Sequence, residues 1–180
     1  MLFIYGVLAL ITIIGAGVQI WRSRDRTAAS VLDSILSFFI FSFVGLAGVF
    51  FFYEHVFNAD AAAENIGWAT GNPFQFEVAM SNLGYGVAGL LCLRWRGGFR
   101  WATTTVFSVV YWGASFGHIY QLVVNDNRNP GNAGAVLYTD IALPLVLIAL
   151  MTAYELSARR MRRSQLAPVA AEEAERKRAA

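Results

Sequence analysis

Five apolar stretches dominate this chain, and each is long enough to cross the hydrocarbon core of a bilayer, which takes about 20 helical residues. They cover residues 2–21, 31–57, 74–95, 101–124 and 135–156. None of them alternates polar and apolar side chains as the strands of a membrane barrel do. Because a backbone in hydrocarbon must satisfy its own hydrogen bonds, each stretch predicts a helix. The sequence therefore predicts an all-α integral membrane bundle of five transmembrane helices.

Composition excludes an ordinary soluble domain. The 180 residues are 57% hydrophobic and only 14% charged, whereas charged residues make up about a quarter of a typical soluble domain. The first apolar stretch has no basic residues before it, unlike a secretory signal, so we expect it to stay in the protein as a helix. The lone cysteine, Cys92, excludes an intramolecular disulfide and a cysteine-based zinc motif.

The basic residues indicate how the helices are oriented. Thirteen of the fourteen lie in the connections after the first and third helices or in the carboxyl-terminal tail, and only Arg128 lies on the other side. Those in the two connections are Arg22, Arg24, Arg26, Arg94, Arg96 and Arg100. By the positive-inside rule, the amino terminus is predicted outside and the carboxyl terminus in the cytoplasm. Basic clusters beside apolar stretches are topology signals, so we expect no nucleic-acid partner.

We expect a single transmembrane domain over residues 1–158 and a charged cytoplasmic tail over residues 159–180. The tail ends in AAEEAERKRAA, whose mixed charges are typical of a solvated, flexible segment. The second helix has an aromatic face that includes Phe38 and Phe52. This face could meet the lipid bilayer, a membrane partner or a second copy of the chain.

Five ionisable residues fall at comparable depth near the predicted outer face, on four different helices: Glu54, His55, Glu77, His118 and Asp140. Such groups in spanning helices usually face the bundle interior and pair or line a polar pocket. The helix dipole favours Glu77 and Asp140 near amino ends, and His55 and His118 near carboxyl ends. Glu54 opposes its dipole and needs a protonated histidine, a proton of its own or a metal ion.

The sequence leaves three explanations of this layer open. With ionised acids and neutral histidines the layer would carry a charge of about −3, which requires shared protons or a cation. The first explanation is a divalent metal, Fe, Mn or Zn, with Glu54, Glu77, His118 and Asp140 as candidate ligands, although the Glu-x-x-His pair of di-iron bundles is absent. The second is a metal-free hydrogen-bonded or proton-binding cluster, and the third is a set of unconnected interfacial residues.

Further polar residues surround the layer. The predicted ligand-binding residues are Glu54, Glu77, Asn82, His118 and Asp140, supported by His55, Gln75 and Tyr138. Polar residues of the fourth helix recur at intervals of four and three, which places them on one stripe. They are Thr104, Ser108, Tyr111, Ser115 and His118. The stripe could be a proton path, or its hydroxyls could serve helix packing.

Glycines of the third and fourth helices suggest close helix contacts. They are Gly84, Gly86 and Gly89, and the pair Gly113 and Gly117 in a small-xxx-small pattern. Small residues let membrane helices approach closely. We therefore expect these positions to mediate packing.

Several segments of the sequence resemble those of a known family. IGWATGNPFQFEV, NLGYG, GHIYQ and NPGNAGAVLYTDIALP resemble those of a family of small multi-pass prokaryotic membrane proteins catalogued only as a domain of unknown function. The resemblance covers about residues 31–156. It implies a compact helical domain in a bacterial or archaeal plasma membrane, and it brings no activity or ligand with it. The matching motif positions include Trp68, Gly71, Pro73, Gln75, Glu77, Asn82, His118, Asn132, Tyr138 and Asp140.

The leading functional hypothesis is a binding or transport component whose outward-facing site takes a cation, a proton or a small polar ligand. The alternative is a membrane enzyme, metal-dependent or acid/base, with His118 as the proton-transfer group and Glu77 or Asp140 as its partner. A third hypothesis is an accessory subunit whose polar cluster is structural. The sequence alone does not decide whether the protein is an enzyme.

Overall fold

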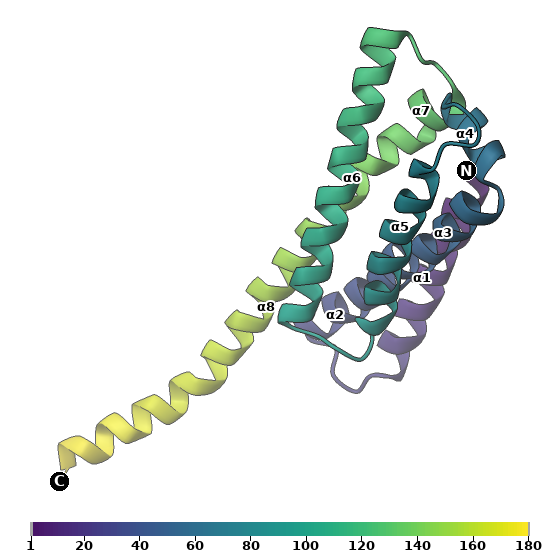
Figure 1. The fold of residues 1–180 in the computed structure, drawn as a ribbon. Coiled ribbons are helices and arrows are strands. Elements are labelled where there is room, and N and C mark those ends of the chain that lie inside the picture. Colours follow the sequence, from purple (N-terminus) through teal and green to yellow (C-terminus); the bar gives the residue numbers. More distant parts are fainter. Residues whose placement is uncertain (1, 180) are drawn as a thin grey trace.

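The computed structural model describes residues 2–179, with side-chain positions for residues 3–168 and 176. Its regular structure is helical, and residues 2–179 contain no strand, so the predicted all-α class is confirmed. The elements are α1 (Leu2–Arg22), α2 (Ala28–Phe39), the π-helical segment η1 (Ile40–Leu46), α3 (Ala47–Phe57), α4 (Ala59–Ile66), α5 (Phe74–Leu91), α6 (Gly98–Asn125), α7 (Pro130–Ala133) and α8 (Ala135–Ala179). Figure 1 shows one bundle of long helices, from which the end of α8 projects.

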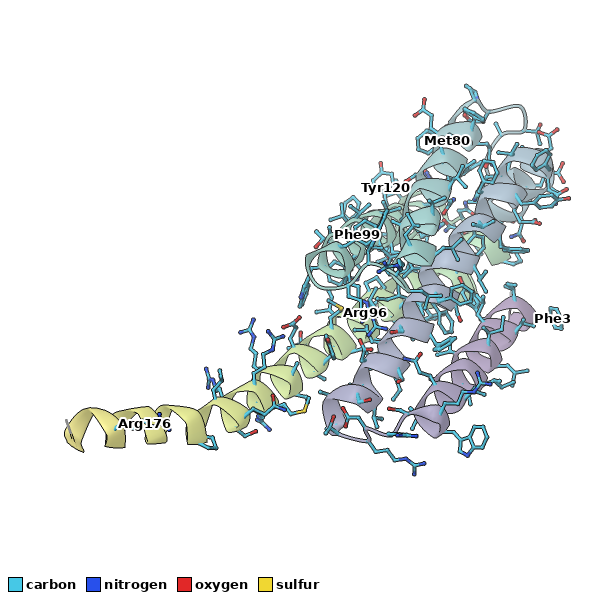
Figure 2. All side chains as sticks on the ribbon, turned by 90° about the horizontal axis from the view of Figure 1, so that it is seen from below. Phe3, Met80, Arg96, Phe99, Tyr120 and Arg176 are labelled. Carbon is cyan, nitrogen blue, oxygen red and sulfur yellow. The ribbon has the colours of Figure 1, made fainter. Side chains whose placement is uncertain are left out.

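The projecting part of α8 carries the charged tail. The helix runs without a break to Ala179, and Arg176 stands on it well away from the bundle (Figure 2). The other side chains of the predicted charged end, residues 169–175 and 177–180, lie outside the described part of the chain. The flexibility expected for residues 159–180 stays a prediction.

In the part of the chain that the structure describes, three helical stretches are long and apolar enough to cross a membrane: Phe3–Arg22, Ala28–Phe57 and Pro130–Pro168. The other two predicted spans correspond to α5 and α6, which are not among the three. Both carry more polar residues, because α5 contains Gln75, Glu77 and Asn82 and α6 contains the polar stripe. The structure thus supports a membrane protein, and the count of five spans stays a prediction.

The helices α2, η1 and α3 form one continuous rod, and its glycines contact α5. A Cβ atom added to Gly48 would lie 2.6 Å from the Cα atom of Gly86, and one added to Gly89 would lie 2.6 Å from the backbone nitrogen of Gly45. Only glycine permits backbones to approach this closely. The seven-residue π-helical segment contains Gly45, so the rod makes this contact where its helical turns are wider than those of an α-helix.

The expected packing role is wrong for three other glycines. A Cβ atom added to Gly84, Gly113 or Gly117 would meet no described atom within 4 Å. These positions face open space. The prediction was wrong because spacing along a helix shows which residues share a face but not what that face meets. The small-xxx-small pattern of α6 therefore leaves a gap beside the helix.

The short helices α4 and α7 and the loop of residues 126–129 form a cap over one end of the bundle, next to the amino terminus (Figure 1). Asn127 donates from Nδ2 to the carbonyl oxygen of Ile66 at 2.8 Å. Gly67, which ends α4, adopts a left-handed φ of 85° that glycine allows at little cost. Amide side chains thus fasten the loop before α7 to the end of α4.

A buried ion pair ties together the opposite end of the bundle. Arg100, only 1% exposed, donates to Asp33 Oδ1 and to Ser37 Oγ, both at 2.7 Å, and more weakly to the carbonyl oxygen of Cys92 at 3.4 Å. Arg96 donates to the second carboxylate oxygen of Asp33. Asp33 was not predicted from the sequence, and Arg100 was taken only as a topology signal, yet its side chain lies inside the protein. The cluster joins α2, the end of α5 and the start of α6.

Removing the negative charge of this cluster should destabilise the fold. Asp33→Asn leaves the buried guanidinium of Arg100 without its counter-charge, which costs about 3–5 kcal/mol. The matched control is Asp126→Asn, because the Asp126–Arg128 pair is about three-quarters exposed and an exposed pair contributes about 0–1 kcal/mol. Thermal unfolding of both variants in detergent would measure the difference. Equal, small decreases in the unfolding temperature of the two variants would contradict a stabilising role for the buried pair.

Candidate functional site

A cavity of about 1210 Å³ lies beneath the cap, among α3, α5, α6 and α8. The first turn of α1, the helices α4 and α7 and the residue Trp68 complete its walls. It exceeds the roughly 300–1,000 Å³ of most small-molecule sites. Six of the residues predicted from the sequence line it: Glu54, His55, Glu77, Asn82, His118 and Asp140.

Two residues expected to support the site lie elsewhere. Gln75 is buried at the start of α5, behind the cavity wall, where its side-chain oxygen contacts Nδ1 of His55. Tyr138 is 70% exposed and does not line the cavity. Tyr138 is two residues from the inward-facing Asp140, and positions two apart on a helix point about 200° apart, so the two side chains take opposite sides of α8.

His118 is held in one orientation by Asn132. Nδ1 of His118 lies 2.8 Å from Oδ1 of Asn132, while Nδ2 of Asn132 donates to the carbonyl oxygens of His118 and Asn127 at 3.2 and 2.8 Å. Because the amide nitrogen faces two carbonyls, its oxygen must face the ring, and Nδ1 of His118 must be the donor. Asn132 is fully buried, so the ring presents its other nitrogen, Nε2, in a fixed direction.

Nε2 of His118 faces the carboxyl group of Asp140 at 3.8 Å. Asp140 is only 7% exposed, and no described residue forms a hydrogen bond with its side chain. In its neutral form with Nδ1 protonated, His118 offers a lone pair at Nε2, and an ionised carboxylate also only accepts. The two groups therefore need a shared proton or a donor supplied from the cavity.

The opposite wall carries a second histidine arranged in a similar way. His55 on α3 meets the Gln75 side-chain oxygen through Nδ1. Beside it, Glu54 accepts from Nδ2 of Asn58 at 3.1 Å and is partly exposed. The Asn58 amide and solvent therefore stabilise the Glu54 carboxylate, which opposes the helix dipole. The sequence suggested a protonated histidine, a proton or a metal ion in this role instead.

The floor of the cavity is aromatic. The Tyr85 and Tyr111 rings meet edge to face with centroids 5.9 Å apart, and both residues are at most 5% exposed. The Tyr85 hydroxyl donates to Oδ1 of Asn82. The Tyr85 hydroxyl and the side-chain oxygen of Asn82 are thus paired at the base of the site.

The carboxylates and histidines do not converge on one point. Of the residues that the structure describes, no three His, Cys, Asp or Glu side chains are grouped closely enough to hold a metal ion. The metal candidates Glu54, Glu77, His118 and Asp140 share the cavity but stand on different walls. The donor set therefore consists of pairs, which suits hydrogen bonding or proton sharing better than metal ligation.

Asn132 belongs to this site but was not among the site residues predicted from the sequence. It stands in the asparagine-rich stretch before α8, which reads as a set of turn formers. Its position within the motif NPGNAG, one of those carrying the family resemblance, was the available signal. Which asparagine turns inward depends on the short helix α7 and could not be read from composition.

A family model described as "Family of unknown function (DUF6790)" matches residues 2–160. No curated protein and no solved structure matches the chain. The suspected relationship to an uncharacterised family is confirmed, and it extends the matched region to α1.

Replacing Asn132 should release the orientation of the His118 ring. In protein labelled with ¹⁵N-histidine, which contains two rings, we expect a proton on Nδ1 of His118 in the parent. Asn132→Leu should allow the tautomer with a proton on Nε2. Asn125→Leu is the control, because Asn125 is exposed and bonded only to Gln121 among its described neighbours. A parent ring protonated at Nε2 alone would contradict the assigned geometry.

Proposed function

This chain belongs to the DUF6790 family of unknown function, and we propose that it is a multi-pass membrane protein whose outward-facing cavity binds a cation or hydrogen-bond donor at His118 and Asp140. We further propose that α5 and α6 cross the bilayer beside the three more apolar spans. The distribution of basic residues supports an external amino terminus and a cytoplasmic carboxyl terminus. The cap then lies outside and the Arg100 cluster inside, in the plasma membrane of a prokaryote.

The observation that carries this proposal is the arrangement of acceptors around the cavity. Asp140 is nine-tenths buried and lines the cavity, and its carboxyl group lies 3.8 Å from Nε2 of His118. Three carboxylates and two histidines line the space, and no described Lys or Arg does so. A buried carboxylate needs a proton or a cation. The Tyr85 and Tyr111 rings could add cation–π attraction.

Binding of a simple cation should depend on Asp140. Butylammonium at ten times its Kd should stabilise the detergent-purified parent by about 1.4 kcal/mol, seen as a rise in the unfolding temperature. Asp140→Asn should weaken binding at least tenfold, since it removes the charge and keeps the shape. Glu155→Gln is the control, because Glu155 lies on the same helix and pairs with Arg159 outside the cavity. Equal stabilisation of parent and Asp140→Asn would overturn the proposal.

Proton-linked transport is a second candidate, favoured by the stripe on α6. Thr104, Ser108, Tyr111 and Ser115 are all at most 5% exposed and lead from the cavity towards Arg100. The hydroxyl oxygens of Thr104 and Ser108 have no hydrogen-bond partner among the described atoms. Buried hydroxyls without partners are places where water can bind. Ser115 instead donates to the carbonyl of Tyr111 at 2.9 Å, as expected for a packing role.

Transport along the stripe predicts a difference between two adjacent threonines. Thr104→Val should lower proton flux into proteoliposomes at least tenfold, because it removes a buried hydroxyl without changing the shape of the side chain. Thr105→Val should leave the flux unchanged, since the Thr105 hydroxyl is exposed and donates to the carbonyl of Trp101. A pH-sensitive dye inside the vesicles would measure both. Equal flux in the two variants would assign the stripe to helix packing.

A further inference from the structure

The size and walls of the cavity specify the kind of ligand more closely. Building on the proposed cation site, we propose that the occupant is an amphiphile with a primary-amine head group and a hydrocarbon tail, which enters from the outer leaflet between α5 and α6. A membrane amine of this kind would place its head against Asp140 and His118. Its tail would lie along the apolar walls towards the mouth of the cavity.

The volume of the cavity favours a ligand larger than a simple cation. A small cation would occupy a minor part of about 1210 Å³. Most of the remaining wall is apolar and includes Phe50, Phe51, Val78 and Val110. Water against such surface costs about 25 cal/mol per Å². A ligand that carries its own apolar body removes this cost, and a small polar ligand does not.

The polar groups and the large apolar groups that line the cavity differ in depth. Asp140, Asn82, Tyr85, Tyr111 and Asn132 line the cavity and are at most 8% exposed. These groups form the deep, polar part of the site. The strongly exposed lining residues of α5 and α6 include large apolar side chains, namely Phe74 at 50%, Tyr120 at 52% and Phe116 at 73%. The exposed lining of α5 also includes the polar residues Glu77 and Ser81. The site is therefore polar at its base and carries large aromatic side chains beside these two polar residues at its mouth, which fits a ligand with a polar head and a hydrocarbon tail.

The cavity opens on the flank of the bundle and is covered at its capped end. The cap walls the outer end, where Asn127 is bonded to Ile66 and a Cβ atom on Gly131 would lie 2.5 Å from Asn65. The flank between α5 and α6 is exposed instead, and Gly113 and Gly117 on α6 line it without a described neighbour at their Cβ positions. A flank of a membrane bundle faces lipid. The least obstructed route to Asp140 therefore starts in the bilayer.

The charge of the cavity walls selects the head group of the ligand. With Glu54, Glu77 and Asp140 in the walls and no described basic side chain except the two histidines, the cavity disfavours phosphate and carboxylate heads. A primary ammonium offers three donors. It can satisfy the carboxyl oxygen of Asp140 and Nε2 of His118 together, since these two acceptors are 3.8 Å apart.

The test uses the full chain in phosphatidylcholine nanodiscs with nitroxide-labelled octadecylamine. We expect an immobilised spectral component that saturates at one probe per protein and that falls at least tenfold in Asp140→Asn. Gly117→Phe and Gly113→Leu, which fill the mouth of the cavity, should lower this immobilised component by a similar factor. Gly84→Phe is the matched control, because Gly84 also faces open space but lies outside the lining. Unfolding temperatures of all variants would confirm that each is folded.

Changing the tail and the head of the probe separates the possible failures. Nitroxide-labelled butylamine should need at least a tenfold higher total concentration than octadecylamine to give the same immobilised spectral component. Octadecanoic acid with the same label should give no immobilised component that depends on Asp140. Butylamine binding as readily as octadecylamine, with no effect of Gly117→Phe, would overturn the amphiphile and leave the cation site. Immobilisation of the acid equal to that of the amine would overturn the amine head. No binding of either amine that depends on Asp140 would overturn the cation site as well.

A partner helix in the same groove would give a different result. The purified parent would then be an oligomer, and Gly117→Phe would reduce its mass in light scattering without any change in probe binding. That outcome would overturn the proposal of an amphiphile.

Discussion

The buried guanidinium of Arg100 is the interaction on which the arrangement of the helices depends. It is the largest of the almost fully buried side chains, and its acceptors come from α2 and from the end of α5. An arginine cannot lose its proton in this setting, so its burial requires all of these partners at once. The requirement fixes the start of α6 against α2 and α5. From this fixed end the polar face of α6 leads to His118 at the cavity.

The two ends of the bundle satisfy their buried polar groups by different means. The Arg100 cluster pairs full charges, whereas the less exposed contacts of the cap come from asparagine side chains, which donate and accept without a net charge. Neutral amides cost less to bury than ions, provided that each donor and acceptor is satisfied. Asn132 meets that condition with three contacts and is fully buried. A cap built in this way can reach down to His118 and hold its ring while adding no charge to a cavity that is already rich in carboxylates.

The sequence predicted the parts of this structure that follow from helical periodicity and from the cost of burying charge. The all-α class and the gathering of Glu54, Glu77, His118 and Asp140 around one space come from these two rules. The Asp33–Arg100 pair was missed because an arginine beside an apolar stretch looks the same whether it points outward as a topology signal or inward to a partner. The glycines of α6 were misjudged for a similar reason, since a small residue permits both close packing and an opening. Tertiary contacts decide between such alternatives, and a single sequence does not contain them.

In a bilayer, the tail of the proposed amphiphile can contribute little to its affinity. A hydrocarbon chain that moves from lipid into an apolar cavity leaves one apolar environment for another, so it gains little of the roughly 0.8 kcal/mol per CH₂ that burial from water provides. Discrimination among membrane amphiphiles must therefore come from the head group, at Asp140 and His118. The fixed ring orientation matters for this reason: acceptors that are already in place lose little entropy when a donor arrives between them. In the proposed site, the apolar walls would determine where the ligand comes from, and the polar base would determine which head group binds.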